Sequence, residues 1–433
     1  MDHATSASPA VQAQLDRLTM LSPGADVLGL ERIAALLDRL GDPQHRLPPV
    51  FHVAGTNGKG STCAYLRAVL EAAGHRVHAY TSPHLVRFNE RIRIAGTLID
   101  DDTLAPLLAR VLDHADGLGA SFFEVTTAAA LLLFAETPAD ACVLEVGLGG
   151  RLDATNVVAD PAACGIAQLG IDHEAFLGSD AAGIAREKAG IARAGRPLVT
   201  LAYPAPIAAA VAEVADAAGA PIFAQRRDWD FALTADRVTY RDPTRTIDMP
   251  RPALPGEHQA GNLALAVAML CRQDRVAVPP HAFSQGAAAA RWPARMQRLG
   301  DGPLTRVLAR GTPVWLDGGH NPAAAGAVAA TLAAQAGGAR VHLIVGMLAN
   351  KDARGFLAPF APVAASLTAV PVAGHAHHAP DDLAAIAAAV GIDARAAPSL
   401  EVALRGVPPG PVAVIGSLYL AGEALLQNDE LPD

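Results

Sequence analysis

The sequence predicts an α/β protein of two domains, each built on a mostly parallel sheet. The chain has 433 residues, more than one hydrophobic core usually supports. Hydrophobic residues make up 51% of the chain but aromatic residues only 4%, so Ala, Leu and Val must fill the interior, which suits helices packed on a sheet. Short apolar runs alternate with helical patterns along most of the chain, and this alternation is typical of parallel sheets.

The first domain is expected over residues 1–292. It opens with a β-α-β unit, in which a strand at 49–54 is followed by a helix at 60–73 and a second strand at 76–81. A small β excursion is expected between 223 and 254, where short polar and β-prone pieces replace the alternation. The other elements expected here are strands at 140–146 and 164–169 and helices at 124–135, 179–191 and 259–272.

The second domain is expected over residues 299–433, after an extended linker at 293–298. The alternation of strands and helices starts afresh there, and about 130 residues is an ordinary size for a domain. Strands are expected at 314–317, 340–346, 366–372 and 412–416, and helices at 323–336, 381–390 and 418–426.

Charge and cysteine content restrict the classes of protein to which the chain can belong. The 34 Lys+Arg against 43 Asp+Glu give a net charge of −9, which argues against a general nucleic-acid or membrane-surface binder. The four cysteines are widely spaced and form no C-x-x-C pair, so neither a zinc site nor a disulfide framework is indicated. No signal-peptide pattern and no apolar run long enough for a bilayer is evident, so we expect a cytoplasmic protein that holds anionic ligands by local charge.

The most specific motif is Gly-Thr-Asn-Gly-Lys-Gly-Ser-Thr at 55–62, which follows the first strand and begins the first helix. A glycine-rich turn lets backbone N–H groups approach an anion, Lys59 adds a positive charge, and the helix contributes its positive end. The spacing departs from G-x-x-x-x-G-K-[ST], because Gly60 separates Lys59 from Ser61. We therefore predict a compact P-loop that binds a nucleotide triphosphate, with Ser61 or Thr62 near Mg²⁺. The alternative is an ordinary Gly/Asn turn.

Polar residues also follow two other predicted strands. Glu145 ends an otherwise apolar strand, and the glycine-rich run 147–150 comes directly after it. Asp172 and His173 follow the strand at 164–169, at what should be the same edge of the sheet. Ligands of open α/β sheets collect at this edge, so a carboxylate there can hold a metal next to the P-loop. The alternatives are a surface glutamate and a structural histidine. The sequence pattern alone marks Lys188 as an ordinary surface lysine.

A basic patch is predicted after the second strand, where the segment 82–84 is followed by Arg87, Arg91 and Arg93. Arg91 and Arg93 share a face if this stretch is extended, which suits a substrate that carries a carboxylate. The alternative, nearly as well supported, is that these arginines are exposed and pair with Glu90.

Two further clusters lie in the second predicted domain. Asp317 and His320 join a strand to a helix, where an aspartate can accept from a ribose hydroxyl, although capping by Asn321 explains part of the motif. His375, His377 and His378 lack the spacing of a zinc site, so we interpret them as part of a polar loop.

Taken together, these motifs resemble those of the Mur ligase superfamily, and within it the family of bacterial dihydrofolate synthases/folylpolyglutamate synthases. The resemblance covers nearly the whole chain and implies a P-loop ATPase-like N-terminal domain, a smaller Rossmann-like C-terminal domain and an active site in the cleft between them. Its carriers are residues 55–61, 81–85, 87–91, 144–156, 172–173, 187–191, 317 with 320–322, 346–347 with 351–352, and 416–417. Ala294 stands where glycine is usual and Gly319 where alanine is common, which weakens the ATP assignment only slightly.

The resemblance also implies a role for single residues. It implies two Mg²⁺ ions held by Ser61, Ser82, Glu145 and His173, with a monovalent cation as a further candidate. It implies that Lys188 is carbamylated by CO₂ and acts in catalysis with Lys59 and His173. The residues expected to bind ATP are Asn57, Gly58, Lys59, Gly60, Ser61, Asn262, Arg295, Asp317 and His320. The residues expected to bind the pterin substrate are Asp26, Gly29, Phe122, Phe123, Glu124, Asp153, Ala154 and Thr155, and the patch adds Arg87 and Arg91.

The activity implied by the resemblance is ATP-dependent ligation of L-glutamate to dihydropteroate and to the γ-carboxylate of folates, through an acyl phosphate. The enzyme is expected to be a monomer that acts on small molecules. Two alternatives remain, namely another Mur-type ligase acting on a peptidoglycan precursor and a P-loop regulator that is not a ligase. We expect no uridine-binding domain ahead of Val53, which argues against the first; ATP hydrolysis without dependence on glutamate would identify the second.

Overall fold

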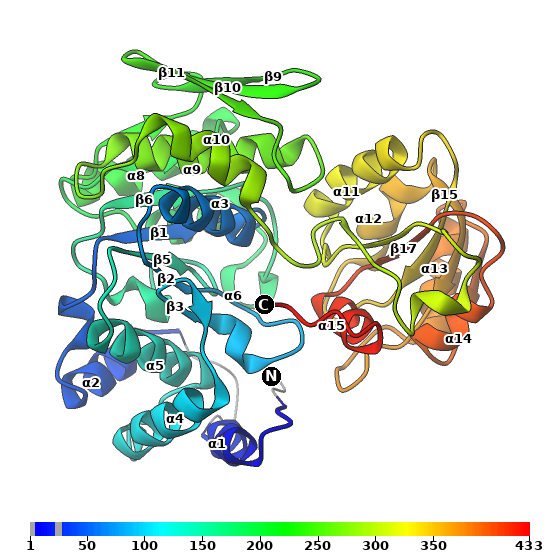
Figure 1. Ribbon diagram of the computed structural model, residues 1–433, viewed down its shortest axis with the longest axis horizontal. Helices are drawn as coiled ribbons and strands as arrows, with labels where there is room; N and C mark the ends of the chain where they lie inside the picture. Colours follow the sequence, from blue (N-terminus) through cyan, green and yellow to red (C-terminus); the bar gives the residue numbers. More distant parts are fainter. Residues whose placement is uncertain (1–4, 22–27) are drawn as a thin grey trace. The chain divides into compact units, whose positions relative to one another are not determined.

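The computed structural model describes residues 5–21 and 28–433, which fold into two compact units (Figure 1). The first unit extends to Ala253 and includes Gln259–Arg291. The second unit comprises Trp292–Pro432 together with Leu254–His258. Each unit has its own sheet and its own hydrophobic core. The predicted α/β fold class is thus confirmed.

The first unit is built on an eight-stranded sheet with the order β4-β3-β2-β5-β1-β6-β7-β8. The strands from β2 to β8 along this order are parallel, whereas β3 and β4 form an antiparallel edge. The strands are β1 Val50–Ala54, β2 Val77–Tyr80, β3 Ile92–Ile94, β4 Thr97–Leu98, β5 Ala141–Glu145, β6 Ala163–Ile166, β7 Leu198–Thr200 and β8 Ile222–Ala224.

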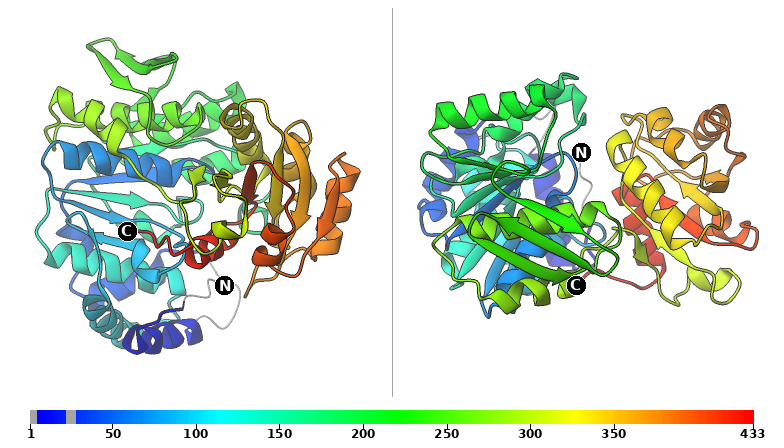
Figure 2. Two further views of the ribbon diagram at one scale, coloured as in Figure 1. Left: turned by 45° about the vertical axis from the view of Figure 1, so that its right-hand side comes forward. Right: turned by 90° about the horizontal axis from the view of Figure 1, so that it is seen from above.

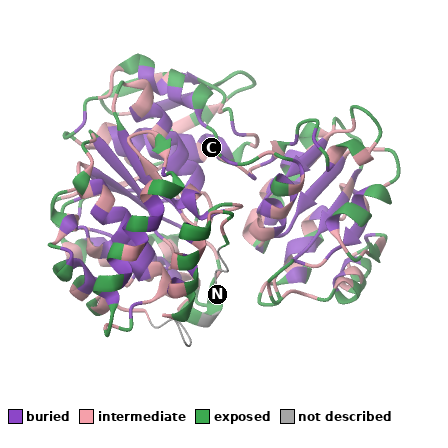
Figure 3. Ribbon diagram, turned by 60° about the horizontal axis from the view of Figure 1, so that its bottom comes forward, coloured by how far each residue is buried: buried purple, intermediate pink, exposed green. Residues whose placement is uncertain are grey.

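Strand β1 lies at the centre of this sheet, between β5 and β6. Every residue of β1 and of β5 is buried, as expected for parallel strands covered on both faces. Figure 3 shows buried strands, in purple, inside each unit. The register pairs Val53 with Glu145 and Ala54 with Ile166, so the three carboxyl ends lie together. The residues predicted to bind phosphate and metal lie at these ends or in the loops that follow them.

Helices cover both faces of the sheet. Val50, Tyr80 and Leu144 pack on α1, α2, α4 and α5, and the same face continues onto α7 and α8. On the other face, α3 packs against α10 through Gly286, where an added Cβ would lie 2.6 Å from the Val69 backbone. The helices are α1 Pro9–Met20, α2 Glu31–Arg39, α3 Lys59–Ala72, α4 Asp101–Ala115, α5 Phe122–Glu136, α6 Glu174–Leu177, α7 Ala181–Ala189, α8 Ala205–Ala218, α9 His258–Arg272 and α10 Pro280–Ala289.

A separate antiparallel sheet of three strands projects from the first unit beside α10 (Figures 1 and 2). It consists of β9 Asp230–Leu233, β10 Arg237–Asp242 and β11 Arg245–Pro250. Val238 and Tyr240 are buried on one face of β10, while the polar Arg237, Thr239 and Arg241 lie on the other, where only the two arginines are exposed. The predicted small β excursion is confirmed.

The second unit has a six-stranded sheet of order β12-β13-β17-β14-β15-β16, parallel except for β12. Its core combines apolar residues of β14, β15 and β17 with those of the covering helices. The strands are β12 Gln297–Arg298, β13 Val314–Leu316, β14 Val341–Val345, β15 Ala364–Ala369, β16 Ala394–Ala396 and β17 Val412–Ile415, and the helices are α11 Pro322–Gln335, α12 Ala353–Leu357, α13 Pro380–Ala389, α14 Leu400–Arg405 and α15 Leu418–Gln427.

In the described parts of the chain, no helix combines the length and the apolar character needed to cross a membrane.

Candidate nucleotide and substrate site

The predicted P-loop, named the phosphate loop from here on, comprises residues 55–61 and joins β1 to α3. It leaves a row of backbone N–H donors at the start of the helix. Gly58, with φ 84°, precedes α3, and the first intrahelical bond runs from Thr62 N to Gly58 O at 2.9 Å. The amides of Lys59, Gly60 and Ser61 therefore have no partner within the helix, as in any first turn. A side chain at Gly58 would not fit, because an added Cβ would lie 2.4 Å from Oδ1 of Asn262. The loop thus has the geometry of an anion cradle.

The end of β6 holds the first half of this loop in place. Thr56 N and Asn57 N both donate to the carbonyl of Gln168, at 2.8 and 3.2 Å. The Thr56 hydroxyl donates to the carbonyl of Gly170 at 2.8 Å. These bonds engage the amides of Thr56 and Asn57 within the protein, so the donors left for an anion begin at Gly58.

Two lysines meet at one carbonyl beneath the loop. Lys188 Nζ donates to Gly55 O at 3.0 Å, and Lys59 Nζ donates to the same oxygen at 3.2 Å. Lys188 is buried, on α7. The pKa of Lys188 is lowered to about 7, chiefly by burial and also by the charge of Lys59, while Asp172 and Asp153 act in the opposite direction. A large fraction of Lys188 is therefore neutral near pH 7.

Composition offers a signal for Lys188 that the helical pattern does not. The 34 basic residues include only three lysines, Lys59, Lys188 and Lys351, so arginine serves almost everywhere else. Arginine stays protonated in proteins, whereas a buried lysine readily becomes neutral. Two of these three lysines lie at the phosphate loop, which favours a chemical role for both.

Glu145 and Ser82 lie next to each other at the ends of β5 and β2. Ser82 N donates to Glu145 Oε2 at 3.3 Å, and the Ser82–Pro83 peptide bond is cis. The Glu145 side chain is buried. Burial raises the pKa of the Cys63 thiol, with Glu145 adding to the rise and Lys59 opposing it, so both charges lie close to Cys63 in α3. The structure thus brings the predicted metal ligand Glu145 to the phosphate loop.

The other predicted metal ligands differ in how they are held. Ser61 is buried in the first turn of α3, whereas His173 is exposed, with φ 55°, and heads α6. Among residues 5–21 and 28–433, no three His, Cys, Asp or Glu side chains gather as a metal cluster. Mg²⁺ does not need one, because it usually takes one or two carboxylates and fills its shell with waters and phosphates. A buried carboxylate beside a phosphate loop fits that ion.

Glycines after β5 allow two close approaches. An added Cβ on Gly150 would lie 2.7 Å from the carbonyl of Glu187 and 2.8 Å from that of Lys188. An added Cβ on Gly147 would lie 2.4 Å from the ring of Phe123. The absence of side chains therefore brings α7, with Lys188, and the predicted substrate residue Phe123 against the same loop.

The predicted substrate residues Asp153, Ala154 and Thr155 follow that loop and lie buried at the start of a 3₁₀ turn, Ala154–Val157. Asp153 Oδ2 accepts from Leu148 N at 2.8 Å, and its Oδ1 accepts from the Thr155 hydroxyl at 2.5 Å. Burial raises the pKa of Asp153, while its hydrogen bonds to Leu148 and Thr155 lower it. The carboxylate closes the loop on itself.

The predicted substrate residues at the start of α5 are held by a cap. Glu124 accepts from Ser121 N at 2.7 Å in a capping box and pairs with Arg32 at 3.0 Å. Phe122 and Phe123 precede it in the same first turn, both half-buried. Gly29 lies just before α2, and Asp26 lies outside the described residues.

The expectation that Arg91 and Arg93 share one face of an extended stretch is wrong. Arg91 ends a 3₁₀ turn, Phe88–Arg91, and is only 1% exposed, because its guanidinium lies over the rings of Phe88 and Phe122, at 5.6 and 5.4 Å. Its Nε donates to Nδ1 of His84 at 2.9 Å. Arg87 is exposed. Substrate binding by Arg87 and Arg91 stays a prediction.

In the second unit, Asp317 organises the end of β13. Its Oδ2 accepts from Met296 N at 2.9 Å and its Oδ1 from Gly319 N at 2.7 Å. His320 Nδ1 lies 2.9 Å from the carbonyl of Gly318. Asn321 caps α11 through Ala324 N, which confirms the capping interpretation.

Arg295 lies beside Gly318, the residue after Asp317, since an added Cβ on Gly318 would be 3.1 Å from Arg295 Nη1. Two neighbours of the predicted nucleotide residues, His258 and Gln259, were not predicted from the sequence. Burial lowers the pKa of His258, which feels the charges of both Asp317 and Arg295. In the first unit, Gln259 Oε1 accepts from Asn262 Nδ2 at 3.0 Å. The i, i+3 spacing of Gln259 and Asn262 on one helix was the available signal.

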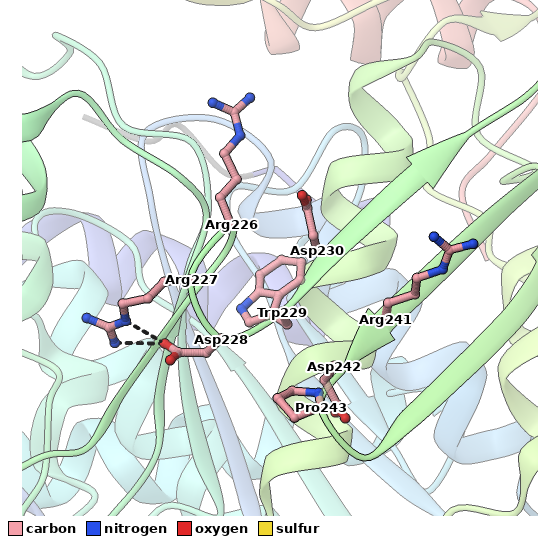
Figure 4. Close-up of a pocket in the computed structure, with 8 residues that line it drawn as sticks. All are labelled: Arg226, Arg227, Asp228, Trp229, Asp230, Arg241, Asp242 and Pro243. Atoms are coloured by element: carbon pink, nitrogen blue, oxygen red, sulfur yellow. Dashed lines mark hydrogen bonds and ion pairs between the residues drawn. The ribbon is translucent and has the colours of Figure 1, made fainter.

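An open hollow lies away from these residues, where β9 and β10 meet the turn before them (Figure 4). Arg227 and Asp228 pair there at 2.7 Å, and Trp229 stacks on Tyr240. Its three arginines balance its three aspartates, so it has no net charge to attract an anion. None of the predicted site residues lines the hollow, so the strand ends of the large sheet are the better candidate.

Comparison with known proteins identifies the family to which the chain is similar. Residues 294–410 match the family described as Mur ligase, glutamate ligase domain. The dihydrofolate synthase/folylpolyglutamate synthase of Escherichia coli (strain K12) is 37% identical over 332 residues, which cover 76% of this chain and 74% of that protein.

Two solved structures are similar over nearly the whole length. The structure of E. coli FolC in complex with DHPP and ADP has a TM-score of 0.87 at 31% identity and covers 98% of both chains. The bifunctional folylpolyglutamate synthase/dihydrofolate synthase of Yersinia pestis, complexed with AMPPNP and Mn ion, has a TM-score of 0.84 at 33% identity and covers 97% of this chain and 98% of that chain.

A phosphate loop on a parallel sheet, joined in one chain to a glutamate ligase domain, defines an ATP-dependent ligase of the Mur type. At 37% identity over most of both chains, the chain belongs to the dihydrofolate synthase/folylpolyglutamate synthase family.

Proposed function

We propose that the chain joins L-glutamate to dihydropteroate, forming dihydrofolate, and extends folates at their γ-carboxylate, driven by ATP. The observation that carries the proposal is the meeting of Lys59 and Lys188 at the phosphate loop, in a chain of this family. The ADP, DHPP, AMPPNP and Mn ion named for the related structures support a nucleotide, a divalent ion and a pterin substrate as ligands.

The triphosphate of ATP would lie on the amides from Gly58 to Ser61. Lys59 would exchange its backbone carbonyl partners for phosphate oxygens, and Asn262 would contact the nucleotide from α9. Ser61, Ser82, Glu145 and His173 would hold two Mg²⁺ ions, with a monovalent cation as a further ligand of the site. When bound, these ions offset the negative charge of the triphosphate and of the substrate carboxylate. In the second unit, Arg295, Asp317 and His320 would contact ATP.

Lys188 would be carbamylated by CO₂. The neutral amine attacks the carbon of CO₂, an N–C bond forms, one C=O electron pair moves to oxygen, and one proton leaves to water. The depressed pKa of Lys188 supplies the neutral amine near pH 7. The resulting anion would lie below the phosphate loop and assist in holding the metal ions and the phosphate.

The pterin substrate would be bound by the loop after β5 and the start of α5. Phe123 lies against Gly147 in this loop, and Asp153 closes it. The remaining members proposed for this site are Asp26, Gly29, Arg87, Arg91, Phe122, Glu124, Ala154 and Thr155.

The reaction would proceed in two steps. A carboxylate oxygen of the substrate attacks the γ-phosphorus of ATP, and ADP leaves with the electron pair of the broken P–O bond. The α-amine of L-glutamate then attacks the acyl phosphate, a tetrahedral intermediate forms, and its collapse expels phosphate while the nitrogen loses a proton. Every partner except the amine is anionic, so the role of Lys59 and of the helix N-terminus is to suppress repulsion in the in-line transfer.

All four cysteines are free, which fits a reducing compartment, and we propose a cytoplasmic monomer.

Glutamate-dependent phosphate release tests this function, with dihydropteroate and tetrahydrofolate offered separately. We expect release with both and none after Lys59→Ala, since that change removes the positive charge at the phosphate loop. Activity with neither substrate, or ATP hydrolysis that ignores glutamate, would refute the proposal. Near-normal ADP release by Lys59→Ala would refute the role given to the loop.

A further inference from the structure

His52 lies buried in the middle of β1, three residues before the phosphate loop, and the reaction proposed above makes no use of it. Its Nε2 lies 2.8 Å from the hydroxyl of Thr155, in the 3₁₀ turn that follows the β5 loop. The two residues are far apart in sequence, and both are almost fully buried. A polar contact of this kind inside a core is costly unless it is fully satisfied.

The positions of the hydrogen atoms follow from the neighbours. The Thr155 hydroxyl has one proton to donate. The Asp153 carboxylate, 2.5 Å away, carries no proton, so in this pair it can only accept. The hydroxyl therefore donates to Asp153 and must accept from His52. His52 thus carries its proton on Nε2, and a directional chain runs from His52 through Thr155 to Asp153.

This series of hydrogen bonds ends at the carboxylate of Asp153, which holds the proposed substrate segment in place. Asp153 accepts from Thr155 N at 3.0 Å and from Leu148 N at 2.8 Å, so its carboxylate ties Leu148, which lies between Gly147 and Gly150, to the start of the 3₁₀ turn. Phe123 and the α7 backbone rest against those two glycines. A rotation of the Thr155 hydroxyl away from Asp153 would loosen the loop where the substrate ring is proposed to bind.

From this geometry we infer that His52 is a positioning residue for the substrate segment Asp153–Thr155, and that it sets the affinity for the pterin substrate rather than for ATP. This inference rests on the proposed function of the site. His52 acts by donating one hydrogen bond, and it touches neither the phosphate loop nor the proposed metal ligands through that bond.

The surroundings keep His52 in the donating, neutral form. The pKa of His52 is lowered to about 3, chiefly by burial and also by the charge of Arg193. Arg193 also donates to the carbonyl and to Oδ1 of Asn156, both at 2.7 Å, and so holds the other end of the same 3₁₀ turn. The contribution of His52 is therefore constant over the pH range in which the enzyme is assayed.

Two substitutions at His52 and one matched control test the inference in the full-length enzyme. His52→Leu keeps the volume but removes the donor, whereas His52→Gln keeps an N–H at the position of Nε2. His78→Leu is the control, because His78 is an equally buried histidine on β2, which lies beyond β5 in the same sheet, and it bonds to Thr137 O and Ala95 N instead. KM for dihydropteroate and KM for ATP are measured for each, together with the midpoint of urea unfolding.

We expect His52→Leu to raise KM for dihydropteroate about tenfold, the factor that corresponds to one lost hydrogen bond, and to change KM for ATP by less than about twofold. His52→Gln should recover most of the loss, and His78→Leu should lower stability without changing either KM. If His52→Leu does not fold, Thr155→Val removes the same link and should raise the same KM.

An unchanged KM for dihydropteroate in the variant without the donor would overturn the inference. So would an equal rise in His78→Leu, an equal rise in KM for ATP, or a loss that His52→Gln fails to recover. A wild-type enzyme that does not ligate dihydropteroate would instead refute the proposed function, so the two failures are distinguishable.

Discussion

Gly150→Ala tests whether the close approach of the β5 loop to α7 positions Lys188. Gly150 has no positive φ, so alanine suits its backbone and only space is at issue. The new Cβ would lie 2.7 Å from Glu187 O, 2.8 Å from Lys188 O and 3.0 Å from Lys188 Cα. All three are backbone atoms that cannot rotate away, so loop and helix must separate by about 0.7 Å to reach ordinary van der Waals contact.

Two effects of known size follow from that displacement. Overpacking of this kind costs roughly 1–3 kcal/mol of unfolding free energy. A shift approaching 1 Å in a catalytic group reduces the rate by about 100-fold, so the ligation rate should fall by roughly that factor. The hydrogen bond from Arg151 N to Glu187 O, at 2.8 Å, lies at the same contact and should weaken too. Urea unfolding and glutamate-dependent phosphate release measure the two effects.

The matched control is Gly326→Ala in α11. An added Cβ there meets nothing within 4 Å, and alanine in a helix interior should stabilise the protein by about 0.5–1 kcal/mol. Activity should stay at the wild-type level. If Gly150→Ala has the unfolding free energy and the ligation rate of the wild type, the close approach of the β5 loop to α7 does not position Lys188.

Three further predictions concern Lys188 and the metal. With ¹³CO₂, the enzyme should show one carbamate ¹³C signal that grows as pH rises through about 7, because the neutral amine of Lys188 is the reacting form; Lys188→Ala should lose the signal and Lys351→Ala should keep it, and a signal that survives in Lys188→Ala would contradict the assignment. Without CO₂, the lowered pKa means that the unfolded chain holds a proton that the folded chain lacks between about pH 7 and 10.5, so the contribution of Lys188 to the unfolding free energy should increase with pH across that window. Removal of divalent ions with EDTA should abolish phosphate release and Mn²⁺ or Mg²⁺ should restore it, while full activity in EDTA would contradict the proposed role of Glu145.

Local chemistry explains why the phosphate loop could be predicted from the sequence. A glycine-rich turn between a strand and a helix leaves N–H groups pointing outward whatever surrounds it, and the structure places Gly58 and Lys59 at the start of α3. Glu145 was predictable for a similar reason, because the carboxyl ends of parallel strands lie at one edge and the register pairs Glu145 with Val53.

Other features depend on contacts between distant parts of the chain and could not be predicted in this way. Lys188 has an ordinary place on a helix, and its lowered pKa arises only because α7 buries it against Gly55. The sequence places Arg91 in a basic patch, whereas in the structure its guanidinium lies over the rings of Phe88 and Phe122. Nothing in the sequence distinguishes His52 from the other residues of the uniformly buried strand β1, because its partner Thr155 comes from a turn 103 residues away.

The central claim is that ATP activates the substrate carboxylate as an acyl phosphate. Dihydropteroate labelled with ¹⁸O in its carboxylate, incubated with the enzyme, ATP and L-glutamate, tests this claim directly by mass spectrometry of the released phosphate. The proposed steps break the bond between the carbonyl carbon and the bridging oxygen, so each phosphate should carry one ¹⁸O atom. Phosphate free of ¹⁸O, formed together with dihydrofolate, would contradict the mechanism.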